Sequence, residues 1–149
     1  MSANGLPIFD KTLQATHIWL DEIMQRIGPD RQAAWKALGA VLHKLRDLLP
    51  VEAAAHLGAQ LPLLVRGLYY DQFRPGQQPS RCRTREEFVA EVAEWLQDAR
   101  PVDPVDAIEA VFGVLSRHLD PGQVAKIEAI VPEPIFRMWT AAEESALGA

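Results

Sequence analysis

The sequence predicts an all-α fold, with about eight helices in two tandem four-helix units that pack as one compact helical domain. The first observation is composition: 48% of the 149 residues are hydrophobic, alanine and leucine dominate, and threonine is scarce, which favours helix over sheet. The second is that apolar residues recur at a period of about 3.6. The third is that the pattern repeats after about seventy residues, with helix-opening prolines at matched positions, Pro62 and Pro132.

The first unit is predicted to span residues 9–73 and to begin with two long helices. An amphipathic stripe over residues 9–27 ends at a Gly-Pro pair, because neither residue continues a helix well. Asp30 can cap the N-terminus of the second helix, which carries a broad apolar stripe over residues 35–49. The loop between them is only about two residues long, so the two helices are expected to be antiparallel neighbours.

Two shorter helices complete this unit, and a linker follows. Pro50 suits the first turn of a helix that reaches Leu57, since its missing N–H would be unpaired there. Pro62 does the same for a helix that reaches about Phe73. Residues 74–83 contain two prolines, one glycine and no apolar periodicity, so we predict that they form the linker.

The second unit is predicted to span residues 84–142. It begins with a capping box, in which the side chains of Thr84 and Glu87 each satisfy a free backbone N–H. Asp103 and Asp120, each followed by proline, are strong starts for the next two helices. Prolines near the end of the repeat open the eighth helix.

Sliding the sequence along itself by about seventy residues aligns the second helix with the sixth. The matched pairs include Leu38 with Ile108, Leu42 with Phe112, and Leu45 with Leu115. A helix pair that cannot bury its stripe alone would bury it against the other unit. We therefore expect the two units to pack on one shared core or on two abutting cores.

The composition also limits the classes of function. The net charge of −5 disfavours a general role in nucleic-acid binding. The single cysteine, Cys82, cannot form an internal disulfide, which fits a reducing compartment. The N-terminal residues MSANGLPIFDK lack the regions of a signal peptide, and no run approaches the ~18 apolar residues of a membrane span. We expect a soluble, cytoplasmic protein.

One stretch, residues 48–75, has a specific pattern: LLPVEAAAHLGAQLPLLVRGLYYDQFRP. Together with the Thr/Arg-Glu-Glu-Phe helix start that follows, it resembles the bacterial domain-of-unknown-function 2267 family (DUF2267). The resemblance covers roughly Thr12 to Trp139 and centres on Leu61 to Tyr70. The family pattern often places Trp before Arg-Pro, where this chain keeps an aromatic residue, Phe73. The resemblance implies a bacterial, soluble, helical protein and supplies no established activity and no catalytic residues.

The residues that carry chemistry form no recognised motif. The four histidines show no HxxxH or HExxH spacing, and the lone cysteine has no CxxC partner, so we expect no metal site and no cofactor. Glu52 and His56 are spaced to touch on a short helix, which a solvated ion pair explains. Cys82 lies among arginines that would lower its pKa and make it reactive, unless it is an incidental surface thiol. We assign no catalytic residue.

The fourth helix and the linker combine aromatic and arginine side chains. On a helix, Tyr69 and Phe73 would share one face, whereas Tyr70 would lie about 100° round from Tyr69. Tyr70 would then pack between the two units or line an exposed groove. Tyr and Arg are favoured at contact hot spots, so we predict a partner-binding surface here. It consists of Arg66, Tyr70, Phe73, Arg74, Arg81 and Arg83.

The favoured function is therefore a non-enzymatic interaction module that binds a protein or peptide partner. The alternative is a small-ligand-binding domain, with an apolar pocket between the two units lined by the tryptophans and Tyr69. A third hypothesis is an enzyme of a type that no motif identifies, for which titratable groups would have to meet in a cleft.

Overall fold

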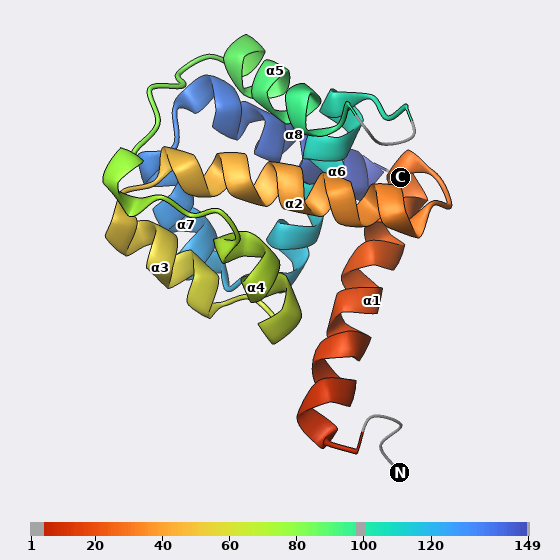
Figure 1. The fold of residues 1–149 in the computed structure, drawn as a ribbon. Helices are drawn as coiled ribbons and strands as arrows, with labels where there is room; N and C mark the ends of the chain where they lie inside the picture. Colours follow the sequence, from red (N-terminus) through yellow and green to blue (C-terminus); the bar gives the residue numbers. More distant parts are fainter. Residues whose placement is uncertain (1–4, 98–100, 149) are drawn as a thin grey trace.

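The computed structural model describes residues 5–97 and 101–148, with side chains up to residue 144 (Figure 1). Within these residues the chain forms eight α-helices, one short 3₁₀-helix and no strand, which confirms the predicted all-α class. Over the same residues, no helix is long and apolar enough to cross a lipid bilayer. The helices are α1 (Pro7–Ile27), α2 (Arg31–Leu48), α3 (Val51–Ala59), α4 (Leu63–Tyr70), the 3₁₀-helix η1 (Pro75–Gln77), α5 (Arg85–Trp95), α6 (Pro104–His118), α7 (Pro121–Ile130) and α8 (Glu133–Gly148).

Side-chain caps explain where several helices begin. The Asp30 carboxylate accepts a hydrogen bond from a backbone amide of the first turn of α2. Thr84 and Glu87 form the predicted capping box of α5, and these hydrogen bonds, chiefly the one with the Thr84 side chain, lower the pKa of Glu87. Asp103 and Asp120 cap α6 and α7. The predicted caps are confirmed. They could be predicted from sequence because a cap involves only a few neighbouring residues.

α4 ends at Tyr70, earlier than the predicted end near Phe73. Gln72 has a φ of 62°, in the left-handed region that turns the chain out of a helix. Phe73 therefore lies beyond the helix, and the prediction that it shares a helical face with Tyr69 is wrong. The chain then forms η1 within the predicted linker.

Helices α2 and α6 form the centre of the fold (Figure 1). α6 packs against α1, α2, α5 and α8, and α2 also packs against α1, α4 and α5. The buried apolar residues of both halves form one cluster, in which Leu42 of α2 and Leu115 of α6 are fully buried. Of the two expected arrangements, the structure thus has the shared core. The internal duplication and the boundaries of the two units stay predictions.

Polar and aromatic contacts join the second half of α1 to α6. Glu22 accepts a hydrogen bond from Nε of Arg117 at 2.6 Å and lies 2.7 Å from Nε2 of His118. The His118 ring also stacks on Trp19, with the ring centroids 5.3 Å apart. These contacts fix the second half of α1 to α6, whereas the N-terminal end of the helix projects beyond the other helices (Figure 1).

Candidate functional site

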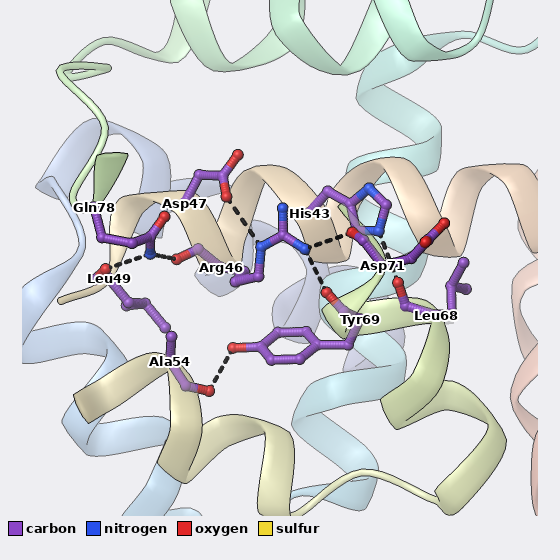
Figure 2. A network of polar contacts seen from close by, with 9 residues as sticks. All are labelled: His43, Arg46, Asp47, Leu49, Ala54, Leu68, Tyr69, Asp71 and Gln78. Carbon is purple, nitrogen blue, oxygen red and sulfur yellow. Dashed lines mark hydrogen bonds and ion pairs between the residues drawn. The ribbon is translucent and has the colours of Figure 1, made fainter. Parts of the chain in front are cut away.

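A buried arginine of α2 organises the segment that carries the predicted surface (Figure 2). Arg46 is only 3% exposed. Its Nη1 donates to the carbonyl oxygens of Tyr69 at 2.6 Å and Asp71 at 3.0 Å, and its Nε donates to the Asp47 carboxylate at 3.0 Å. The guanidinium also lies over the Phe73 ring, 5.1 Å from the ring centroid. Arg46 therefore satisfies carbonyl groups that the end of α4 leaves unpaired.

His43, one turn earlier on α2, serves another carbonyl of α4. Its Nε2 donates to the Leu68 oxygen at 2.7 Å, which places the proton of the neutral ring on Nε2. Nδ1 is buried and has no hydrogen-bond partner among the described residues. The ring meets Trp95 edge-on, with centroids 4.9 Å apart. Burial lowers the pKa of His43 from its usual value and outweighs the hydrogen bond to Leu68, which raises it, so the ring is neutral at pH 7.

The linker is fastened to the end of α2. The Gln78 side-chain amide donates to the carbonyl oxygens of Arg46 at 2.6 Å and Leu49 at 2.7 Å (Figure 2). The backbone amide of Ser80 donates to the backbone carbonyl oxygen of Asp47 at 2.6 Å. The linker thus supplies donors to carbonyl groups at the C-terminus of α2, where a helix lacks partners of its own.

Both readings of Cys82 from the sequence are wrong. The side chain is 5% exposed, so it is not a surface thiol. Burial, followed by the hydrogen bond and negative charge of Glu91, raises its pKa to about 12. Arg83 acts in the opposite direction and is outweighed. Because the thiolate is the nucleophile, we expect Cys82 to react slowly near neutral pH in the folded protein.

Tyr69 and Tyr70 pack within the first half of the chain. Tyr69 is fully buried, burial raises its pKa, and its hydroxyl donates to the Ala54 oxygen at 2.7 Å. Tyr70 is partly buried, and its ring centroid lies 5.0 Å from that of Tyr69 and 5.7 Å from that of Phe73. A Cβ at Gly58 would lie 2.5 Å from the Tyr70 oxygen, so α3 needs glycine there to admit the ring. These contacts place Tyr70 against α3 and not between the two halves.

The arginines of the predicted surface are of two kinds. Arg66 donates to two carbonyl oxygens at and just after the end of α3, at 3.4 and 3.0 Å. Arg83 donates to two carbonyl oxygens of the linker, at 2.9 and 2.8 Å. Arg74 and Arg81 are exposed, and their side chains form no hydrogen bond or ion pair with any residue that the structure describes. Only these two therefore keep all their donors for another molecule.

An exposed apolar surface lies at the start of α1 and of α4. Its members are Leu6, Ile8, Phe9 and Leu13 from the start of α1, and Leu63 and Leu64 from the start of α4, and we call this set the α1–α4 patch. The Leu64 amide donates to the Thr12 hydroxyl at 2.8 Å, which holds the start of α4 beside α1. A groove of about 520 Å³ borders the patch. Its lining combines apolar residues of both helices with three basic ones, Lys11, Arg66 and His118.

A second groove, of about 450 Å³, lies between α3 and α7. Most of its lining is apolar, and Gln123 and Lys126 of α7 are among its polar members. It lies between the two predicted units, as the predicted pocket does, but neither Tyr69 nor a tryptophan lines it; Tyr69 and Trp139 are buried in the core. On α3, Glu52 and His56 line it, and Nε2 of His56 lies 3.9 Å from Oε1 of Glu52, so the two side chains meet as predicted.

Sequence reasoning missed the α1–α4 patch and the residues that line the second groove. The apolar stripe of α1 has one pattern throughout, so periodicity alone does not show that Phe9 and Leu13 are uncovered. The sequence does contain a signal for Gln123. It is a polar residue four positions before the buried Ile127, on the helix face where a buried stripe ordinarily carries an apolar residue. Among the described residues, no three His, Cys, Asp or Glu side chains converge in a way that could hold a metal ion.

A family model described as "Uncharacterized conserved protein (DUF2267)" matches residues 16–138. The resemblance stated from the sequence is thereby confirmed over most of the chain. A comparison with curated proteins gives no match.

Proposed function

The chain belongs to the DUF2267 family of uncharacterized conserved proteins, and we propose that it is a non-enzymatic interaction module that binds a helix of a protein partner through the α1–α4 patch. The observation that carries this proposal is the apolar stripe of α1, which is buried in the second half of the helix and uncovered in the first. Contiguous exposed apolar surface of this kind marks sites of protein interaction.

The stripe has the spacing of a helix that packs along a seam. Its members alternate in steps of three and four residues, the pattern by which one helix inserts into another: Phe9, Leu13, Thr16, Leu20, Ile23 and Ile27. Leu20 and Ile23 are buried, whereas Phe9 is 46% exposed and Leu13 37% exposed. A partner helix with its own apolar face would continue the packing along α1.

The adjoining groove indicates the charge of that partner. Its basic lining residues are Lys11, Arg66 and His118, and no acidic residue is among the residues that line it. Opposite charges steer a partner and suppress wrong ones. We therefore expect acidic side chains beside the apolar face of the partner helix.

This surface overlaps only partly with the one predicted from sequence. Arg66 belongs to both, because it also lines the groove that borders the α1–α4 patch. Tyr70 and Phe73 pack against each other and their neighbours at the other end of that helix. Arg74 and Arg81 provide a second, purely electrostatic surface beyond α4, and a direct comparison of variants separates the two.

The test uses the photo-crosslinking residue p-benzoylphenylalanine, placed at Leu13 and, as a matched control, at the exposed Gln25 of the same helix. Extract of the native host should give a protein adduct from position 13 and none from position 25. A Phe9→Ser/Leu13→Ser variant should lose this partner in affinity capture while its melting temperature changes little, since neither side chain belongs to the buried core. Identical adducts from both positions would refute the proposal.

A second comparison uses the double variant Arg74→Glu/Tyr70→Ala. We expect it to keep the partner captured through α1. If it loses that partner while Phe9→Ser/Leu13→Ser keeps it, the binding surface is instead the end of α4 and the linker.

A further inference from the structure

We propose that the groove between α3 and α7 binds a small amphipathic carboxylate, whose apolar chain lies along the groove and whose head group is held by Gln123 and Lys126. This site shares no residue with the α1–α4 patch and does not depend on the proposed partner.

Gln123 gives the main reason to assign a ligand. The residue is 8% exposed and lines the groove, yet its side-chain amide forms no hydrogen bond with any described residue. The side-chain nitrogen and oxygen of Gln123 are not themselves buried, so the amide is open to the groove and free to bind a molecule there. The amide offers a donor and an acceptor to a molecule in the groove. A bound carboxylate oxygen would accept from its Nε2.

The shape and lining of the groove suit an apolar chain. Its volume of about 450 Å³ falls within the range of ligand pockets, roughly 300–1,000 Å³. The walls include Leu49, Ala53 and Ile127, and the small side chain of Ala53 leaves space on α3. Ile130, although 40% exposed, also lines the groove, and a bound chain would cover it.

The charges of the lining favour an anion over a cation. Lys126 lies three residues after Gln123, so the two side chains share one face of α7. Its ammonium group has no ion pair with a described residue. The single acidic member of the lining, Glu52, is directed at His56, 3.9 Å away on the same helix. The α7 side of the groove is therefore the positive side.

The experiment titrates the intact protein with hexanoate, octanoate, decanoate and the neutral analogue octanol by isothermal titration calorimetry. Octanoate should bind saturably, with affinity rising along the carboxylate series, and octanol should bind at least about tenfold more weakly, because it lacks the charge-assisted hydrogen bonds. Gln123→Leu and Lys126→Gln should each weaken octanoate binding roughly tenfold.

Matched variants separate this site from adventitious binding. Ala129 lines the groove and Ala125, on the same helix, does not, and both are exposed. Ala129→Trp should abolish octanoate binding, whereas Ala125→Trp and the distant Lys36→Gln should leave it unchanged, with circular dichroism showing that all variants fold. Absence of saturable binding to the wild type, equal binding of octanol, or undiminished binding to Ala129→Trp would overturn the proposal.

Discussion

Replacing Arg46 by methionine removes the charged group at the centre of the α2–α4 contact and keeps an unbranched side chain in its place. The substitution leaves the carbonyl oxygens of Tyr69 and Asp71 and the carboxylate of Asp47 without their donor. The Tyr69 carbonyl is the critical one, because this hydrogen bond is buried and water does not replace it.

The expected loss follows from these contacts. Hydrogen bonds to charged groups contribute about 1.5–3 kcal/mol each. Asp47 is partly exposed and Asp71 is exposed, so water compensates there in part. We expect Arg46→Met to lower the free energy of unfolding by about 3 kcal/mol, a large part of the roughly 5–15 kcal/mol that a domain has.

Urea melts of the wild type and the variant measure this loss. A slope of about 1–3 kcal/mol/M converts the expected loss into a midpoint lowered by about 1–3 M. The control is Arg117→Met, which removes a close contact with Glu22 at a side chain that is 45% exposed. An exposed pair contributes less than about 1 kcal/mol, so the control should unfold near the wild type. Equal losses in the two variants, or an unchanged midpoint for Arg46→Met, would refute this account of α4.

Four further predictions follow from burial and packing. Leu42→Ala should lower the free energy of unfolding by about 2–5 kcal/mol through the cavity it leaves, and a loss below about 1 kcal/mol in urea melts would argue against the core. Cys82 should react slowly with a thiol reagent at about pH 8 in native buffer and rapidly in urea, and fast native labelling would contradict its burial and raised pKa. Because the folded pKa of His43 lies below the usual 6.5, the unfolded chain binds more protons just below pH 6.5, and stability should fall as the pH drops through that window. His43→Gln should lack this part of the decline, and equal declines would assign it to other groups. The halves on either side of Arg83, expressed separately, should unfold without cooperativity, and two sharp melts near the intact midpoint would indicate independent cores.

The sequence predicted what depends on near neighbours. The caps at Asp30 and Thr84 and the order of the helices require only a few adjacent residues and a period. The end of α4 was predicted wrongly because it depends on Arg46, which lies 23 and 25 positions from the carbonyls it serves. No local pattern in the Tyr69-to-Phe73 stretch records that contact. The predicted loop at residues 74–83 is likewise held by bonds to α2.

The candidate sites were harder to predict for a different reason. Tyrosine and arginine are frequent at interfaces, but they also pair inside proteins, as Arg66 does with carbonyl oxygens near the end of α3. Composition does not separate these two uses. Periodicity predicted which face of α1 is apolar. It did not predict how much of that face other helices cover, because this depends on where α6 packs against α1. The position of Gln123 in a groove depends on the packing of α3 beside α7, which no local pattern in the sequence records.

The packing of α6 against both α1 and α2 has a consequence for synthesis on the ribosome. When Arg83 leaves the exit tunnel, the first four helices have been made, but α6, which packs against α1 and α2, has not. The nascent chain therefore carries an uncovered apolar surface until residues up to His118 have emerged. Such intermediates aggregate readily and are bound by chaperones that hold exposed apolar segments. A stop codon or a strong translational pause between α5 and α6 should thus yield insoluble product, whereas a pause after α8 should not.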